Sequence, residues 1–121
     1  MAKPIRKCLE NKNGKVWTIA PEATVFEAIT QMAERSIGAL VVVKNDRTVG
    51  IVTERDYARK LILLGRSSRD TRVCDVMTSR VIYVHPEQTV EECMAIMTER
   101  RIRHLPVLDA QQKLIGLISI G

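Results

Sequence analysis

The sequence predicts a mixed α/β (α+β) fold built from two copies of one β-α-β-β-α unit. Residues 16–43 and 81–108 align without a gap at an offset of 65, and twelve of the 28 paired positions are identical. Unrelated segments agree at about one position in twenty, so the similarity indicates internal duplication. Each copy carries a capping signal ahead of a helical pattern, and then two apolar segments of strand length around a polar turn. We place the first repeat within residues 1–66, and a linker with the second repeat within residues 67–121.

The first half of each repeat predicts a short strand and a helix. The segments 16–19 and 81–84 are extended in pattern, and each leads into Pro-Glu-x-Thr. Thr24 with Glu27, and Thr89 with Glu92, have the spacing of a capping box, so a helix is expected to begin after each threonine. Apolar residues then recur on one helical face, which we assign to the core and not to a cofactor pocket. They are Val25, Ala28, Ile29, Met32 and Ala33 in the first helix, and Val90, Cys93, Met94 and Met97 in the second.

The second half of each repeat predicts a pair of strands. They cover residues 39–43 and 49–52 in the first repeat, and 105–108 and 114–118 in the second. The first repeat continues into a helix from Glu54 to about Leu64, with Gly65 as its stop. The matching helix of the second repeat would lie after Gly121. Short helical lead-ins are expected at 73–77 and, as its counterpart, at 5–9.

The strand-to-helix corner at residues 50–56 is the best candidate for a site. A helix N-terminus offers unpaired N–H groups and a positive dipole end, which suit an anion. However, Thr53-x-x-Asp56 also fits a capping box, in which the acid closes back on the helix start and binds nothing. Spacing alone favours the capping box, and both interpretations stay open.

Composition limits the classes of partner. The net charge of +5, from 19 basic and 14 acidic residues, indicates an anionic partner. Aromatic residues make up only 3% and no dense basic run is present, so a phosphate-bearing small molecule is favoured and nucleic acid is the alternative. The three cysteines lack metal-ligand spacing, so we expect no metal site and reduced, packed thiols. No apolar run approaches the roughly 20 residues of a membrane span, and no signal-peptide pattern follows Met1, so a cytoplasmic protein is expected.

Apolar residues at 61–64 surround the predicted helix instead of following one face. A helix packed on one sheet needs only one apolar stripe, so the surplus predicts a second partner surface. Self-association into a homodimer is the simplest explanation. A purely structural dimerisation module without a ligand is therefore a further alternative. No nucleophile and base are paired in the sequence, so an enzyme is not expected.

The duplicated unit with its Gly-x-x-Thr-x-x-Asp corner resembles the cystathionine β-synthase (CBS) domain pair, also called a Bateman module. The resemblance covers nearly the whole chain, and no catalytic domain is attached to it. It implies a stand-alone pair with a pseudo-twofold axis between the repeats and adenine nucleotides (AMP, ADP, ATP, sometimes NAD or S-adenosylmethionine) in clefts at their junction. The residues that carry it are Ile19-x-Pro21, 37–42 and 50–56 in the first repeat, Val84-x-Pro86, 102–107 and 116–119 in the second, and the linker 75–78.

The resemblance also implies roles for individual residues. Thr53 and Asp56 would hold the ribose, and the second repeat offers only Ser119 at the matching position, so one complete site is expected. The other residues of that expected site are Thr18 and Ile19 near the adenine, Arg103 and His104 near the phosphates, Arg55 as a further cation, and Ala39 and Pro106 on the strands. His104 has an alternative as a hydrogen-bonded residue at a strand edge, and His85 is expected to face solvent in a turn. The ligand would be regulatory and not obligatory, and the sequence identifies neither the preferred nucleotide nor the effector protein.

Overall fold

The computed structural model describes residues 3–10 and 16–120, which form two compact units. The first-repeat unit is Trp17–Val81, and the second-repeat unit combines Met1–Val16 with Ile82–Gly121. This division differs from the expected boundary at residue 66. The segment 67–81 packs with the first repeat, and the described residues ahead of Trp17, chiefly 3–10, pack with the second.

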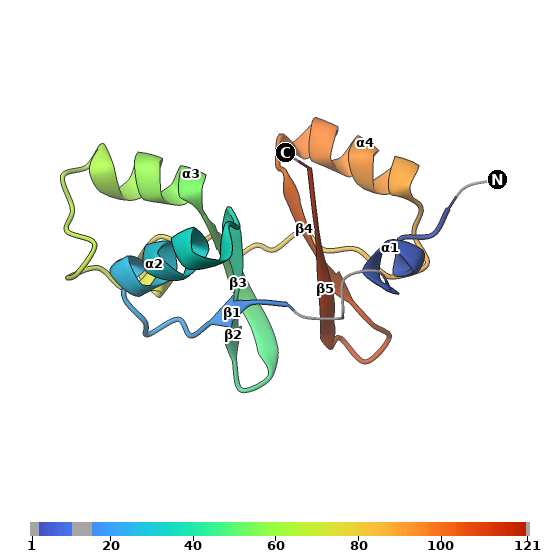
Figure 1. The fold of residues 1–121 in the computed structure, drawn as a ribbon, viewed down its shortest axis with the longest axis horizontal. Coiled ribbons are helices and arrows are strands. Elements are labelled where there is room, and N and C mark those ends of the chain that lie inside the picture. Colours follow the sequence, from blue (N-terminus) through green and yellow to red (C-terminus); the bar gives the residue numbers. More distant parts are fainter. Residues whose placement is uncertain (1–2, 11–15, 121) are drawn as a thin grey trace. The chain divides into compact units, whose positions relative to one another are not determined.

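The first-repeat unit is a three-stranded sheet with helices on one face (Figure 1). In the sheet order β1-β2-β3, β1 runs parallel to β2 and β2 runs antiparallel to β3. A parallel pair needs a crossover, which the helix between β1 and β2 provides. The elements are β1 (Thr18–Ile19), α2 (Val25–Arg35), β2 (Ala39–Lys44), β3 (Arg47–Thr53), α3 (Glu54–Tyr57), the π-helix η1 (Ala58–Ile62) and the 3-10 helix η2 (Val73–Asp75).

The core of this unit lies between the sheet and the helices. Along α2, Val25, Ala28 and Met32 are buried as predicted, at a spacing of one helical turn. They meet alternate residues of the strands, including Leu40 and Val42. The expectation for Ala33 is wrong: it is exposed, because the buried stripe of α2 is narrower than the apolar pattern of its sequence.

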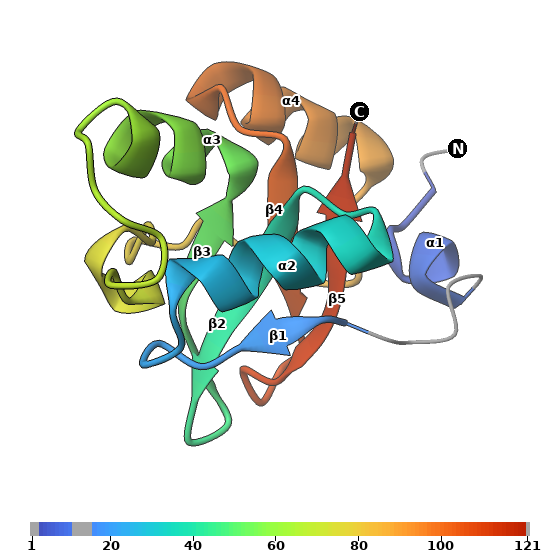
Figure 2. The same ribbon diagram turned by 60° about the vertical axis from the view of Figure 1, so that its left-hand side comes forward.

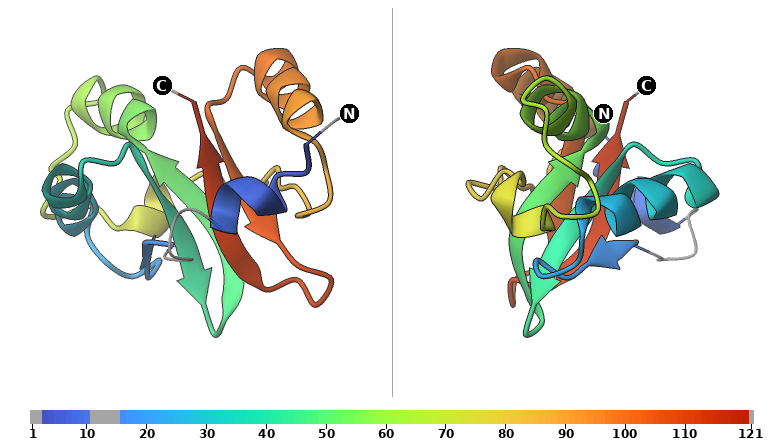
Figure 3. Two further views of the ribbon diagram at one scale, coloured as in Figure 1. Left: turned by 45° about the vertical axis from the view of Figure 1, so that its right-hand side comes forward. Right: turned by 90° about the vertical axis from the view of Figure 1, so that its left-hand side faces the viewer.

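The second-repeat unit has the same plan with fewer strands. Its elements are α1 (Arg6–Glu10), α4 (Val90–Arg100), β4 (His104–Leu108) and β5 (Leu114–Ser119). An isolated parallel bridge between Val84 and Val107 takes the place of β1, and both helices lie on one face of the β4-β5 pair (Figure 3). Met94 is 50% exposed, which contradicts its assignment to the core. Cys93 and Met97 are buried as predicted, and Ile96, which was not predicted, packs against them.

The two long helices are capped at equivalent threonines, but of the two predicted capping boxes only the second is complete. The hydroxyl of Thr24 accepts from the Glu27 amide at 3.1 Å. Thr89 and Glu92 form the full capping box, with bonds of 3.1 and 3.0 Å. The helices α2 and α4 in Figures 2 and 3 therefore begin at equivalent positions, as predicted.

The lead-ins each pack on the repeat that they do not precede. The Val73 amide donates to the carbonyl of Ala23 at 2.8 Å, and the Ile5 amide donates to that of Gln88 at 2.8 Å. Ala23 and Gln88 are separated by the repeat offset of 65 residues, so the two bonds are equivalent. This exchange explains why the units divide near residues 17 and 81 and not at residue 66.

Two glycines make room for the lead-ins. A Cβ atom at Gly50 would lie 2.5 Å from the Met77 sulfur, and one at Gly116 would lie 2.5 Å from Leu9 Cδ2. Any larger residue would push the lead-in away from the strand, which is why the close approach favours glycine at both positions.

The helix after the corner is not the continuous α-helix that the sequence predicted. After the four residues of α3 the backbone widens into η1, and the Leu63 amide donates to the carbonyl of Ala58, five residues earlier, at 3.2 Å. Leu61 is buried, whereas Ile62, Leu63 and Leu64 are exposed, so the predicted surplus of apolar surface is present. Gly65 follows with a φ of 68°, which confirms it as the stop.

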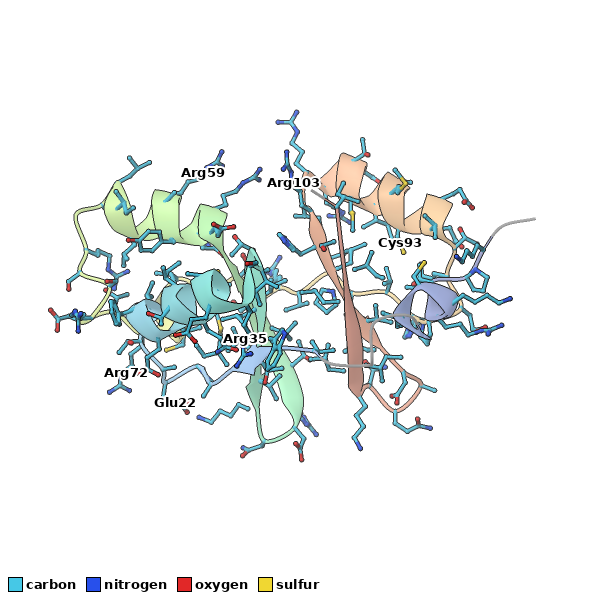
Figure 4. The ribbon with its side chains drawn as sticks, in the orientation of Figure 1. Glu22, Arg35, Arg59, Arg72, Cys93 and Arg103 are labelled. Carbon is cyan, nitrogen blue, oxygen red and sulfur yellow. The ribbon has the colours of Figure 1, made fainter. Side chains whose placement is uncertain are left out.

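The cysteine of α4 is buried in the second-repeat core. Cys93 projects from α4 toward α1 in Figure 4 and is 1% exposed. Burial raises the pKa of its thiol, and the nearby Glu92 and Cys8 raise it further. Cys74 is exposed and Cys8 is partly exposed. In the described residues none of the helices is long and apolar enough to cross a membrane.

Thiol labelling is expected to separate the three cysteines. Cys74 and Cys8 should react with iodoacetamide in the folded protein, and Cys93 should react only when the protein unfolds. Because the folded protein keeps the Cys93 proton above the usual pKa of 9.0, the unfolded chain binds fewer protons there, and stability should fall as pH rises past that value. Peptide mass mapping after timed labelling measures the reaction rate of each cysteine. Equal rates at all three cysteines would contradict the burial of Cys93 in α4.

Candidate functional site

The strand-to-helix corner is a closed hydrogen-bonded turn. Thr53 ends β3 in an extended conformation, and its hydroxyl accepts from the Asp56 amide at 3.2 Å. The Asp56 Oδ2 atom accepts in return from the Thr53 amide at 2.9 Å and from the Thr53 hydroxyl at 3.2 Å. The capping-box bonds that this spacing predicts are therefore present, and binding of a ligand by the same carboxylate stays a prediction. The two bonds from Thr53 fix the orientation of the Asp56 carboxylate. The Asp56 side chain is also only 9% exposed.

A lysine one turn later takes the other oxygen of this carboxylate. The Lys60 ammonium lies 3.0 Å from Asp56 Oδ1 and donates to the Val76 carbonyl at 3.0 Å. With the two bonds to Oδ2, these contacts use three of the roughly four acceptor positions of a carboxylate. Sequence reasoning missed Lys60. The i, i+4 spacing from Asp56 was the available signal.

Strand pairing brings several predicted residues of the first-repeat unit together. Ala39 lies opposite Thr53 in the β2-β3 register, and Thr18 lies opposite Val41, two residues along from Ala39. Ala39 is buried and small, and Thr18 is exposed. The side chain of Ile19 belongs to the hydrophobic core, so only its backbone is available to a ligand. Arg55 is exposed at the start of α3.

The remaining predicted residues lie in the second-repeat unit. His104 begins β4 opposite Ser119, which repeats the Ala39–Thr53 pairing. Arg103 precedes it as an exposed side chain at the start of β4 (Figure 4), and its carbonyl accepts from the Ile120 amide at 3.1 Å. Pro106 is buried within β4. That Arg103 and His104 approach a ligand held by Asp56 stays a prediction.

The histidines offer no metal site. His85 is exposed as expected, with its Nδ1 atom 3.1 Å from the Leu108 carbonyl. His104 is a paired strand residue of intermediate exposure, and its role at a ligand stays a prediction. Within residues 3–10 and 16–120, no cluster of three His, Cys, Asp or Glu side chains could hold a metal ion.

A hollow of about 320 Å³ lies between the C-terminal part of α2 and Glu54 at the start of α3, and the sequence did not indicate it. It is at the low end of the volumes typical of small-molecule pockets. Apolar residues of α2 supply part of its wall, the residues that follow α2 supply another part, and Glu54 of α3 supplies a carboxylate. Its lining is Ile29, Met32, Ala33, Ser36, Ile37, Gly38 and Glu54.

The comparisons with known proteins agree with this architecture. The CBS domain family matches residues 11–63 and 73–121. A solved CBS-domain protein from Burkholderia ambifaria MC40-6, which its description connects with signal transduction, is 52% identical with a TM-score of 0.94, over 98% of this chain and 89% of that one. The mitochondrial CBS domain-containing protein CBSX3 of Arabidopsis thaliana is 48% identical over 103 residues, which are 81% of this chain and 50% of that protein. Inosine-5'-monophosphate dehydrogenase of Thermoplasma acidophilum is 41% identical over 105 residues, 86% of this chain and 20% of the enzyme.

Two α+β repeats, the first of which carries a fixed Thr–Asp corner, are the architecture of a CBS domain pair. The chain belongs to the CBS domain family, as a pair of CBS repeats. It spans about half the length of the plant relative and a fifth of the dehydrogenase.

Proposed function

We propose that this CBS pair is a non-catalytic sensor that binds an adenine nucleotide (AMP, ADP, ATP or NAD) at the Thr53–Asp56 corner. The observation that carries the proposal is the fixed carboxylate of Asp56, which is almost buried and held by three donors within one helical turn. A pre-oriented carboxylate suits the adjacent hydroxyls of a ribose, because little side-chain freedom is lost when they bind.

The residues around the Thr53–Asp56 corner favour a nucleotide as the ligand over a diol that has no base or phosphate. Ala39 opposite Thr53 is a small side chain beside the corner, and the backbone of Thr18 and Ile19 on the neighbouring strand would offer peptide groups to a base. In the proposal, Arg103, His104 and Pro106 of the second-repeat unit complete the site, with Arg55 as a further cation. Arginine forms paired hydrogen bonds to phosphate oxygens, which accounts for phosphate selectivity.

Binding of the nucleotide is proposed to change how the repeats, or two copies of the chain, associate, and an effector protein would respond to that change. A role in transmitting a signal to another protein part is supported by the Thermoplasma dehydrogenase, because there the matched segment is only a fifth of a larger protein.

A thermal-shift panel tests the proposal. AMP, ADP, ATP, NAD, NADH and S-adenosylmethionine are compared at equal concentrations. A ligand at 100 times its dissociation constant adds about 2.7 kcal/mol to the stability of the folded state, so at least one compound should raise the melting temperature. If none does, the chain is better described as a structural association module. Retention on DNA with a steep salt dependence would favour the nucleic-acid alternative instead.

Replacing Arg103 by alanine is expected to weaken AMP binding about tenfold and to leave adenosine binding almost unchanged. The reason is that a charge-assisted bond to the phosphate is lost, while the base and ribose contacts stay. Calorimetric titration of both ligands measures the difference. Arg100→Ala, at the end of α4, removes the same charge from the same unit and serves as the control. Equal losses for AMP and adenosine would remove Arg103 from the phosphate site.

We propose in addition that a second copy of the chain covers the exposed apolar end of η1. Leu63 and Leu64 are 76% and 67% exposed, and Phe26 of α2 adds a further apolar side chain. The hollow at the C-terminal end of α2 is lined also by Glu54 of α3 and lies apart from these side chains in the sequence, so each copy offers both protruding leucines and a partly apolar hollow. Leu63→Lys should shift sedimentation from dimer to monomer at micromolar concentration, because a charge would be buried in the contact. An unchanged sedimentation coefficient would contradict the contact.

A further inference from the structure

We propose that Lys60 is a latch that joins the site carboxylate to the lead-in of residues 73–77, and that a diol must displace it from Asp56 to bind there. The proposal rests on the nucleotide site proposed above and adds a regulatory residue to it. Its basis is a single ammonium group that lies 3.0 Å from Asp56 Oδ1 and donates to the Val76 carbonyl at 3.0 Å.

The first step is the competition at Asp56. Oδ2 is committed to the amide and hydroxyl of Thr53, and Oδ1 is in contact with Lys60. About one acceptor position is left on the carboxylate, whereas a ribose presents two adjacent hydroxyl donors. One hydroxyl can bind without rearrangement. The second needs the position that the Lys60 ammonium occupies.

The second step is the other end of the latch. Val76 is buried, and its lead-in is tied to the first repeat by the Val73 bond to Ala23 and by a Cys74 amide bond to the Pro21 carbonyl at 3.0 Å. The same lead-in continues along the chain into the second repeat. The Lys60 bond to Val76 is therefore a direct link between the ligand carboxylate and the segment that connects the repeats.

Lys60 lies in the π-helix η1, beside a buried residue. Leu61 is buried and anchors η1 against the core, while the preceding Lys60 is partly exposed and able to change partners. Wide turns of this kind inside a helix are common at functional sites. Arg59, the preceding cation, projects from the same turn away from the sheet (Figure 4) and is exposed, so it offers a matched control.

Adenosine is the probe for the competition, because it carries the diol without a phosphate that Lys60 could attract. Lys60→Met keeps most of the length of the side chain and removes the charge. In calorimetry on the full chain it is expected to bind adenosine about three- to tenfold more tightly than the wild type, since the competitor is gone. Arg59→Met should bind as the wild type does. Weaker adenosine binding by Lys60→Met would show that the lysine only holds Asp56 in place, and would overturn the displacement.

A measurement without ligand tests the tether itself. Amide hydrogen exchange at Val76 and Met77 should be about three- to tenfold faster in Lys60→Met, and unchanged in Arg59→Met and Lys60→Arg. Unchanged exchange in Lys60→Met would overturn the latch. If neither the wild type nor any variant binds adenosine or AMP, the nucleotide site and the displacement step fail together, and the exchange result still decides whether the tether exists.

Discussion

Replacing Leu61 by alanine is expected to lower the free energy of unfolding by about 2–5 kcal/mol, the range for a buried leucine whose removal leaves a cavity. Leu61 is 1% exposed and belongs to the core cluster with Val25, Met32 and Val73. Chemical denaturation followed by circular dichroism measures the loss. The slope of the transition should be unchanged, because the surface exposed on unfolding is nearly the same.

Leu63→Ala is the matched control for this prediction. It makes the same chemical change two residues later, at a side chain that is 76% exposed. A surface substitution of this kind should alter stability by no more than about 0.5 kcal/mol, provided that the measurement is made below the concentration of self-association. If the two variants lost similar amounts of unfolding free energy, that result would contradict a buried Leu61 beside an exposed Leu63 in this segment.

Asp56→Ala is expected to weaken nucleotide binding about 10- to 100-fold, because hydrogen bonds to a charged group are worth about 1.5–3 kcal/mol each. The same change removes the acid of a capping box and leaves Lys60 without that partner, so it should also lower stability by about 1–2 kcal/mol. Binding and stability therefore have to be measured on the same variant, and the comparison needs a control for the cap.

Glu92→Ala provides that control. Glu92 closes the equivalent capping box on Thr89 at the start of α4, and it lies outside the expected ligand site. Its loss should cost about 0.3–1 kcal/mol of stability, as expected for an exposed acid at a helix N-terminus, with nucleotide affinity unchanged. A loss of affinity in Glu92→Ala as large as in Asp56→Ala would show that stability and not the carboxylate governs binding.

The features predicted correctly from the sequence depend on local chemistry. Thr24 and Thr89 each cap a helix because a hydroxyl three residues ahead of an acid satisfies the free amides of the first turn. The hairpin strands follow from two short apolar segments on either side of a polar turn. The duplication strengthened each of these predictions, because every signal occurs twice.

The features that the sequence did not reveal depend on packing between distant segments. No local signal says that Ile5 packs on the second repeat and Val73 on the first, since both exchanges use backbone bonds. The turn widens at η1, where the Leu63 amide reaches the Ala58 carbonyl and Leu61 is buried, so a regular helix was the wrong expectation. Met94 resembles a core residue in spacing, and only the position of α4 on its strands shows that it faces outward.

The candidate site was predicted in part. The corner of Thr53 and Asp56 has the predicted capping bonds, and strand register places Ala39 beside it. The role of Lys60 could not be derived, because an i, i+4 pair is common on helix surfaces and only the structure shows that this ammonium also reaches the Val76 carbonyl. The hollow beside Glu54 likewise arises from the way in which α2 and α3 meet.

One calorimetric series tests the nucleotide site most directly: AMP titrated into the wild-type chain, into Asp56→Ala and into Glu92→Ala at a temperature where all three are folded. We expect saturable binding to the wild type, the same affinity for Glu92→Ala, and an affinity about 10- to 100-fold lower for Asp56→Ala. Binding to Asp56→Ala with wild-type affinity would contradict the assignment of this carboxylate to the ligand.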